Sequence, residues 1–183
     1  MRYASCMSDE YVDHIDESGK TLAHVLKSHA HVHGLLHPTV IAYVKLGDTW
    51  ALVRQTPDRQ DAGQLVAPVG GHVKAGESEI AALLRETEEE IGVRNLSHRL
   101  VGRAQFHRRI LGRDENHLFV VYEIEPKDEI VLGTEADAVE TFTTEELRQA
   151  LHATPERFGD AHYFVFEKFY PHMLPTTWQP RWN

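Results

Sequence analysis

The stretch from Gly71 to Val93, GHVKAGESEIAALLRETEEEIGV, constrains the fold of this chain more than any other. It predicts a glycine-bounded loop that leads into a helix, with Ser78 as the N-cap and Gly92 as the residue that ends the helix. Apolar side chains and one threonine recur along it at helical spacing, which predicts that one face of the helix packs on a sheet. The members of this stripe are Ile80, Leu83, Leu84, Thr87 and Ile91.

Three glutamates of the same helix share another face. Glu86, Glu89 and Glu90 lie at i, i+3 and i+4, so their side chains point the same way. Like charges this close repel one another, which a helix tolerates when the face is solvated or when a cation binds there. Carboxylate oxygens are ligands that Mg²⁺ prefers, and Mg²⁺ also binds substrate phosphates. The glutamates alone leave both interpretations open, an exposed acidic face and a metal site.

The spacing of the whole stretch favours the metal site. It resembles the Nudix box, in which these residue types recur at these distances, and so long a pattern is a specific signal. The matching positions are Gly71, Glu77, Arg85, Glu86, Glu89, Glu90, Gly92 and Val93. Thr87 departs from the pattern, since the family usually has an aliphatic residue there. Its methyl group can pack in the apolar stripe, and its hydroxyl can bond the backbone one turn back.

The resemblance implies an α/β fold, a Nudix-type α/β/α sandwich around a mixed β-sheet, and the order of the predicted elements agrees with it. An N-terminal β-hairpin should precede this sandwich, with a turn at Ser18-Gly19. We expect extended segments at 11–15, 21–25, 39–46, 50–54, 65–69, 95–107, 117–124 and 135–142, a turn at 112–116, and helices at 144–150 and 160–170.

Composition indicates the domain organisation and the partners. The 183 residues include 42% hydrophobic and 26% charged side chains, which is ordinary for one globular domain. We predict a single domain over 1–183, with residues 1–10 disordered, the hairpin and a histidine-rich segment over 11–36, and the core over 37–170. The net charge of −9 argues against a nucleic acid partner. Without an apolar run that spans a membrane or a signal peptide, we expect no membrane partner and a cytoplasmic protein.

The resemblance implies a function as well: hydrolysis of a diphosphate bond in a nucleoside diphosphate linked to some group X, or in a related small molecule. Such a reaction uses Mg²⁺ or Mn²⁺ to neutralise the phosphate oxygens and to acidify the attacking water. By the match, Glu86, Glu89, Glu90 and the Gly71 carbonyl hold the metal ions. Nudix proteins often form dimers, so the resemblance is compatible with a homodimer in which the hairpin serves the interface.

The match assigns further roles around the metal ions. Arg85 should bond Glu77 and so lock the loop to the helix, which makes both part of the catalytic set with Glu86 and Glu89. The general base is open between these two box glutamates and two later acids, and we favour a box glutamate. The later acids are Glu135 and Asp137.

Substrate phosphates need basic partners in a protein of negative net charge. Arg54, at the end of a predicted strand, and Arg59, in the polar loop that follows it, are the first candidates for substrate binding. We expect one or two arginines of a wider set to reach the diphosphate, and its other members are Arg103, Arg108, Arg109 and Arg113.

Outside the box, the chain resembles one branch of the superfamily, the type 1 isopentenyl diphosphate isomerases and the bacterial hydrolases similar to them. The likeness runs from the hairpin sequence VDHIDESGK through Lys27 and the histidine-rich segment, and it returns in residues 147–169. It implies a second metal held by histidines and glutamates. The residues that match this second site are His37, His72 and Glu115, with either His29 or His31 as a further histidine. His117 stands where the family has a second glutamate, and it can still serve as a ligand.

One residue argues against the isomerase reaction itself. That chemistry uses a cysteine two residues before the histidine matched to His72, and this chain has Gly70 there. We therefore expect a Mg²⁺-dependent diphosphate hydrolase. The alternatives are an isomerase-like enzyme and a non-catalytic Nudix module that senses a nucleotide, although a mere binder has no need of three crowded carboxylates.

Overall fold

The computed structural model describes residues 10–110 and 112–179, and its elements follow one another as expected for a layered α/β fold. The strands are β1 (Tyr11–Ile15), β2 (Thr21–Leu26), β3 (His37–Leu46), β4 (Thr49–Gln55), β5 (Leu65–Val66), β6 (Val69–His72), β7 (Leu96–Ile110), β8 (Arg113–Pro126) and β9 (Ala136–Thr143). The helices are α1 (Lys27–His33), α2 (Glu79–Ile91), α3 (Thr144–Ala153) and α4 (Asp160–Phe169), with short 3₁₀ turns η1 (Pro155–Arg157) and η2 (Pro171–Met173).

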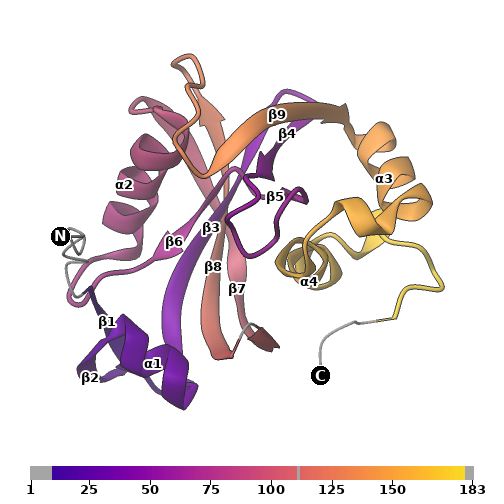
Figure 1. Cartoon of the computed structure of the whole chain (residues 1–183). Coiled ribbons are helices and arrows are strands. Elements are labelled where there is room, and N and C mark those ends of the chain that lie inside the picture. The colour runs from indigo at the N-terminus through magenta and orange to yellow at the C-terminus, as the bar shows by residue number, and fades with distance from the viewer. Residues whose placement is uncertain (1–9, 111, 180–183) are drawn as a thin grey trace, which may run out of the picture.

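Seven strands form one mixed sheet in the order β5-β4-β3-β8-β7, with β6 paired to β3 and β9 paired to β4. α2 covers one face of this sheet and α3 and α4 cover the other, which makes an α/β/α sandwich (Figure 1). The fold class predicted from the sequence is therefore confirmed. None of the helices in the described ranges is long and apolar enough to cross a membrane.

β3 is the central strand, and its side chains alternate between the two layers as the period of a strand requires. Val40 and Val44 belong to the apolar core under α2. Ile41 and Tyr43 belong to the core under α3 and α4. β-branched and aromatic residues suit a strand that is buried on both faces, which is why this segment occupies the middle of the sheet.

α2 begins and ends as predicted. The Ser78 hydroxyl accepts a hydrogen bond from the Ala81 amide, and Gly92 follows the helix with a left-handed backbone (φ 69°). The Thr87 hydroxyl bonds the Leu83 carbonyl at 2.6 Å, which is the contact one turn back that the sequence suggested.

The apolar stripe predicted for α2 is wrong at two positions, since Ile80 and Leu84 are 38% and 42% exposed. The helix buries Ala82 and Glu86 instead, beside Leu83. The buried face is rotated toward the glutamates because α2 packs on β6, where Gly71 leaves room for the Glu86 carboxylate.

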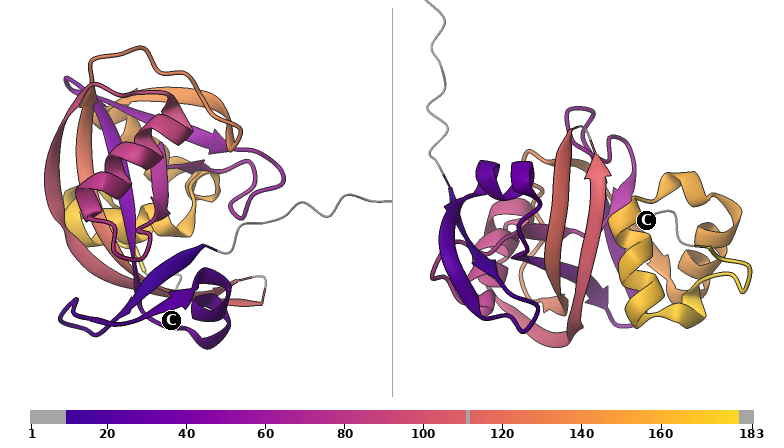
Figure 2. Two further views of the ribbon diagram at one scale, coloured as in Figure 1. Left: turned by 90° about the vertical axis from the view of Figure 1, so that its left-hand side faces the viewer. Right: turned by 90° about the horizontal axis from the view of Figure 1, so that it is seen from below.

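The N-terminal hairpin is confirmed, and β1 and β2 pair antiparallel. The histidine-rich segment after it shows no clear periodicity in sequence, but it forms α1, which ends at Gly34 in a left-handed conformation. Two backbone bonds fasten the hairpin to the core, from Ile15 N to Leu36 O (2.9 Å) and from Ala75 N to Tyr11 O (2.8 Å). Figure 2 shows the hairpin and α1 at the opposite end of the molecule from α3 and α4. The predicted disorder of residues 1–10 lies outside the described residues except for Glu10.

Two further predictions need correction. Residues 113–116 are not part of a turn but open β8, because β7 and β8 continue as a ribbon in which Arg108 lies opposite Glu115. The extended segment 65–69 is two strands rather than one, since β5 pairs with β4 whereas β6 pairs with β3.

Candidate active site and metal centres

Two connected cavities lie at the edge of the sheet where α1, α2 and the loop after β4 meet. The larger is an open trough of about 640 Å³, and every residue that lines it is charged, polar or glycine. The smaller, here called the inner pocket, has about 210 Å³ and continues between the sheet and α4, where Ile41, Tyr43, Phe106 and Phe119 line it. Gly70, Gly71, His72, Glu90, Glu135, Gln55 and Gln60 line both cavities.

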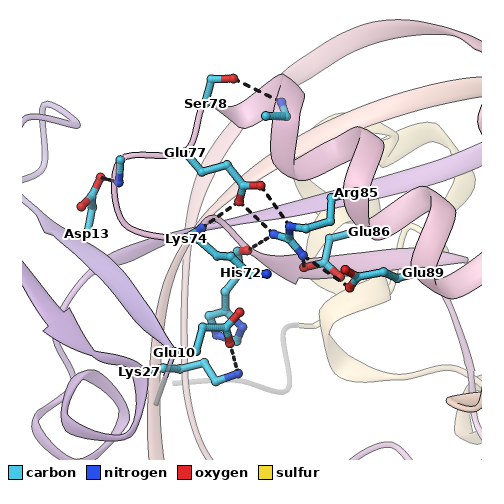
Figure 3. Close-up of polar contacts among 12 residues, drawn as sticks. Glu10, Asp13, Lys27, His72, Lys74, Glu77, Ser78, Arg85, Glu86 and Glu89 are labelled. Atoms are coloured by element: carbon cyan, nitrogen blue, oxygen red, sulfur yellow. Dashed lines mark hydrogen bonds and ion pairs between the residues drawn. The ribbon is translucent and has the colours of Figure 1, made fainter. Parts of the chain in front are cut away.

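Arg85 fastens the loop before α2 to the helix. Its guanidinium donates two hydrogen bonds to the Glu77 carboxylate, at 3.0 and 2.9 Å, and one to the His72 carbonyl at 3.0 Å (Figure 3). The predicted contact between Arg85 and Glu77 is thus confirmed. Burial would raise the pKa of Glu77, but the hydrogen bonds from Arg85 and from the Lys74 amide outweigh it and lower this pKa. Glu77 is therefore held as a carboxylate.

Gly71 permits the glutamates to approach the sheet. A Cβ atom at this position would lie 2.0 Å from the Glu86 carboxyl carbon, so no other residue fits without moving that carboxylate. Arg85 also donates a hydrogen bond to Glu86, and the Gly70 amide donates one to Glu90 at 2.8 Å. The loop backbone and the helix thus hold these two carboxylates at the wall of the trough.

The carboxylates of Glu86 and Glu90 occupy an environment that disfavours their charge. Burial raises the pKa of Glu86, although Arg85 offsets part of this effect. Burial also raises the pKa of Glu90 to about 8, and the charges of Glu86 and Glu135 add to it. Glu89 is the most open of the three, with a 57% exposed side chain, and lies 3.5 Å from Arg85. Hard divalent cations suit such a set, because they prefer oxygen ligands and supply the missing positive charge.

The structure separates the two arginines predicted to bind substrate. Arg59 lines the trough and pairs with Glu135 at 2.7 Å. Arg54 instead points along the surface of β4 and β9, where it pairs with Asp137 at 2.8 Å. Of the two later acids that were candidates for the general base, Glu135 lines the trough and Asp137 is engaged with Arg54.

Four histidines from four different elements meet at the other side of the trough. Each offers one ring nitrogen, and these four atoms all lie within 4.8 Å of one another. The members are His31 from α1, His37 from β3, His72 from β6 and His117 from β8, here called the histidine cluster. Strand register explains the meeting, because His37 lies directly opposite His117 and Thr39 opposite His72.

The distances in the histidine cluster suit a transition metal ion. The Nε2 atom of His31 lies 3.2 Å from that of His72 and 3.4 Å from that of His117. Two nitrogen ligands of a tetrahedral zinc ion, each about 2.0–2.1 Å from the metal, are roughly 3.3 Å apart. Imidazole nitrogen is a good ligand for zinc, copper, iron and nickel.

The hydrogen bonding of His37 supports the same interpretation. Its Nδ1 lies 2.6 Å from the Leu35 carbonyl, which only an N–H can donate to, so the lone pair is on Nε2. Nε2 is buried and has no hydrogen-bond partner among the described residues. Burial lowers the pKa of His37 to about 4, and burial with the neighbouring imidazoles lowers the pKa of His72 and His117. All three are neutral at pH 7, as metal binding requires.

The sequence left His29 and His31 as alternatives for this cluster, and the structure brings only His31 to it. The His29 ring instead contacts the His33 ring, with centroids 4.2 Å apart and the ring planes tilted by 51°, on the exposed side of α1. Glu115 lies beside the cluster but outside the group of four. Its two oxygens accept hydrogen bonds from Arg108 (2.8 Å) and Gln60 (2.8 Å).

Sequence reasoning named Lys27 only in the likeness to isomerases and Arg113 only among several arginines, and it missed that both lie at the histidine side of the trough. Lys27 from α1 and Arg113 from β8 both line it. It also missed the buried network of Arg108, Glu115 and Asp61, in which Arg108 donates to Asp61 at 3.2 Å. The signal available was weak, since these charges are far apart in sequence and an isolated charge usually marks a solvated surface.

Known proteins resemble this chain in part of their length. An uncharacterised Nudix hydrolase of Streptomyces coelicolor is 35% identical over 95 residues, which are 49% of this chain and 50% of that protein. An uncharacterised Nudix hydrolase of Yersinia pestis is 31% identical over 86 residues, 46% of this chain and 47% of that protein. The matched segment spans about half the length of these curated relatives.

Solved structures share the fold. The protein DR0079 of Deinococcus radiodurans superposes with a TM-score of 0.68 at 22% identity, over 88% of this chain and 99% of that one. A Nudix hydrolase of Nitrosomonas europaea gives a TM-score of 0.54 at 28% identity, over 75% of this chain and 91% of that one. The family model for the NUDIX domain matches residues 35–164, which is more than half of the chain. The box, the sandwich fold and this match together show that the chain belongs to the Nudix family.

Proposed function

We propose that this protein is a pyrophosphohydrolase that cleaves a phosphoanhydride bond in a nucleoside diphosphate linked to X or in a related diphosphate. The observation that carries the proposal is the wall of the trough. There Glu86, Glu89 and Glu90 are gathered on one face of α2, and Arg85 holds the loop that carries Gly71 against them. Such an arrangement costs electrostatic free energy unless a cation and an anionic substrate occupy the trough.

Mg²⁺ or Mn²⁺ would be held by Glu86, Glu89, Glu90 and the Gly71 carbonyl. Such an ion supplies charge neutralisation at the phosphate oxygens and a more acidic bound water. Arg85 and Glu77 act as positioning residues, because they fix the loop and the helix relative to each other. Their removal should affect the rate rather than the fold.

For the general base we favour Glu89. It is the most exposed of the three box glutamates, and its contact with Arg85 is long at 3.5 Å, which leaves it able to accept a proton from water. Glu86 instead accepts a hydrogen bond from Arg85. Glu135 pairs with Arg59 and Asp137 with Arg54, which engages both later acids.

For substrate binding we propose Arg59 and Arg54. Arg59 is placed for the role, since it lines the trough and would exchange its partner Glu135 for a phosphate. Arg54 would have to leave Asp137 and turn toward the trough.

The first experiment incubates a panel of compounds with Mg²⁺ or with Mn²⁺, separates the phosphorylated products by chromatography, and compares wild type with Glu89→Gln. The panel contains nucleoside di- and triphosphates, ADP-ribose, nucleotide sugars, dinucleoside polyphosphates and isopentenyl diphosphate. We expect one class to be turned over, and Glu89→Gln to lower kcat by about 10²-fold or more. Glu88→Gln is the matched control, because the neighbouring Glu88 pairs with Arg94 at the surface and lines neither cavity.

Normal turnover by Glu89→Gln would refute the role of this carboxylate. Silence of the folded wild-type protein across the whole panel, with nucleotide binding retained, would instead favour the non-catalytic sensor.

We also propose that the histidine cluster binds a second metal ion of the transition series. Glu115 is the neighbouring carboxylate, and the hydrogen bonds from Arg108 and Gln60 orient it. Metal content after growth and dialysis with Zn²⁺ and Mn²⁺ tests it. His37→Gln should lose the ion, and His98→Gln, an exposed histidine on β7, should keep it. A wild-type protein that carries no metal beyond the ions at the glutamates would overturn this proposal.

The histidine cluster is also the observation that favours the second candidate function, the isomerase-like reaction, because the resemblance to isomerases implied a metal held by histidines. Gly70 speaks against it, since no thiol stands at the position where that chemistry uses a cysteine. Conversion of isopentenyl diphosphate into its isomer, with no phosphate released, would establish the isomerase and displace the hydrolase.

A further inference from the structure

The charges in the trough are not evenly distributed. Glu86, Glu89, Glu90 and Glu135 gather where α2 meets the loop after β4. Lys27 and Arg113 lie at the histidine side, where they line the trough together with His31 and His72. Lys27 precedes His31 by one turn of α1. The trough therefore has an acidic end and a basic end.

Two of the cations near the acidic end are already engaged with protein groups, and a third, Lys74, lies close to Glu77 in the loop before α2. Arg85 bonds Glu77, Glu86 and the His72 carbonyl, and Arg59 pairs with Glu135. An incoming phosphate would have to displace a carboxylate to reach either of them.

The two cations at the basic end retain donors. The Arg113 side chain forms no hydrogen bond or ion pair with any residue of 10–110 or 112–179, and it is exposed. Lys27 donates a hydrogen bond to the Glu10 carboxylate (Figure 3). An ammonium group has three donors, so Lys27 can serve an anion as well as Glu10.

The backbone around this pair is well anchored. Arg113 is the first residue of β8 and lies opposite Ile110 at the end of the β7–β8 ribbon. Three residues further on, the Asn116 side chain donates to the Gly34 carbonyl at 2.9 Å and so ties the ribbon to the end of α1. The two cations therefore come from elements that contact each other.

The walls of the two cavities differ in a way that orients a substrate. The inner pocket offers aromatic and aliphatic surface in about 210 Å³, enough for one compact organic group, since a cavity of about 150 Å³ holds benzene. The trough offers no apolar side chain among its described lining residues. An organic group therefore fits on one side of the glutamates only, and the other side suits an anion.

We infer that Lys27 and Arg113 bind a terminal, unesterified phosphate, so that the substrates are diphosphates or triphosphates with one free end rather than diphosphates esterified at both ends. This inference rests on the proposed hydrolase function. A free terminal phosphate carries about two negative charges near pH 7 and three acceptor oxygens, which matches two cations with unused donors. A second nucleoside or sugar would place a neutral group against them.

The reaction balances for such a substrate. The oxygen of water forms a new bond to phosphorus, the bridging P–O bond of the anhydride breaks, and the bridging oxygen leaves with the departing phosphate. One water proton passes to the general base and is released to solvent. With a nucleoside diphosphate, the products are the nucleoside monophosphate and inorganic phosphate.

Calorimetric titration with inorganic diphosphate and Mg²⁺ tests the inference without knowledge of X. Arg113→Gln should weaken its binding about tenfold, and Lys27→Gln by a similar factor. Arg109→Gln should leave it unchanged, because Arg109 lies on the same ribbon but is 82% exposed and pairs with Asp114. Equal binding by wild type and Arg113→Gln would overturn the inference.

A kinetic comparison separates this inference from the proposed function. ADP should be hydrolysed with at least tenfold higher kcat/KM than ADP-ribose, and Arg113→Gln should reduce that ratio. A preference for ADP-ribose that Glu89→Gln abolishes would refute the free-end inference and leave the hydrolase proposal standing. Hydrolysis that persists in Glu89→Gln would count against the proposed function, whatever Arg113→Gln does to diphosphate binding.

Discussion

The glutamate site and the histidine cluster are neighbours in space but are built in different ways. Gly71, Arg85 and the three glutamates all lie within residues 71–90, which form the end of β6, the loop after it and α2. The histidines come from α1, β3, β6 and β8, between His31 and His117. A site made of one continuous segment can be recognised as a motif. A site made of four elements depends on the register of a sheet and the docking of a hairpin.

The two sites also differ in electrostatics, because burial shifts the pKa values of their side chains in opposite directions. Burial raises the pKa of Glu86 and Glu90, whereas burial lowers the pKa of His37, His72 and His117. In both cases the protein disfavours the charged form of the side chain. The glutamate site requires added positive charge, but the histidine cluster already holds its ligands in the neutral state that binds a metal.

Gly71→Ala should have the largest effect on hydrolysis, and it should disturb the glutamate site but not the histidine cluster. The new Cβ would lie 2.0 Å from the Glu86 carboxyl carbon, so this carboxylate must move, and we expect hydrolysis to fall about 10²–10³-fold. Gly70→Ala is the matched control, because its Cβ would meet nothing closer than Ile41 Cδ1 at 3.4 Å. Steady-state kinetics beside zinc uptake will show whether the sites are independent. Loss of zinc in Gly71→Ala would show that they are coupled.

Arg85→Lys should lower kcat by about 10–100-fold, the usual cost of losing a group that orients metal ligands. Lysine cannot reproduce the fork that reaches Glu77, Glu86 and the His72 carbonyl at once. Arg94→Lys is the control, since Arg94 is a 75% exposed partner of Glu88. Unchanged kcat in Arg85→Lys, measured at saturating Mg²⁺, would mean that the brace is dispensable.

Glu90→Gln should stabilise the metal-free protein at neutral pH. The folded pKa of Glu90 is about 8 and its ordinary value is 4.5, so the folded state binds the extra proton between these values. Its contribution to the free energy of unfolding is therefore complete below pH 4.5 and is lost as pH rises toward 8. We expect the free energy of unfolding of Glu90→Gln to exceed that of wild type by about 3 kcal/mol at pH 7 in a chelator-containing buffer.

Urea denaturation at pH 5 and pH 7, with and without Mg²⁺, measures this difference. Saturating Mg²⁺ should favour wild type, because a ligand that binds only the folded state stabilises it. A difference that is the same at both pH values would contradict the expectation.

His162→Gln should have the smallest effect and provides a reference for one buried imidazole outside the histidine cluster. His162, a buried residue of α4, packs against Phe158 and Phe166, and burial lowers its pKa from 6.5 to about 3. Its stabilising contribution is complete above pH 6.5 and is lost as pH falls, by about 1.4 kcal/mol at pH 5.5. When the pH is lowered from 7.5 to 5.5, the free energy of unfolding of wild type should therefore fall by about 1.4 kcal/mol more than that of His162→Gln.

His98→Gln, at an exposed position, should track wild type in the same denaturation series. The buried histidines of the cluster should add to the loss of wild-type stability as the pH falls. If the total loss is no larger than the loss due to His162 alone, the histidines of the cluster do not titrate as buried neutral groups.

The sequence was most informative where neighbours in the chain are neighbours in the fold. Ser78 and Gly92 were predicted correctly, because caps are fixed locally. The contact between Arg85 and Glu77, eight residues apart, was implied by the family match and is also confirmed. The same helix shows where this ends. Ile80 and Leu84 were expected inside but lie exposed, since the orientation of α2 depends on the close approach that Gly71 allows at β6.

The sequence by itself determined the family, the sandwich fold and the three glutamates that share one face of α2, because helical periodicity orients side chains without reference to distant residues. Tertiary structure alone decided that His31 rather than His29 joins the cluster, that Glu115 is held by Arg108, and that Lys27 and Arg113 form a basic end of the trough. These features depend on the pairing of β3 with β8 and β6 and on the docking of α1. A shift of one residue in such a register turns every side chain to the other face of the sheet, so composition and spacing cannot specify it.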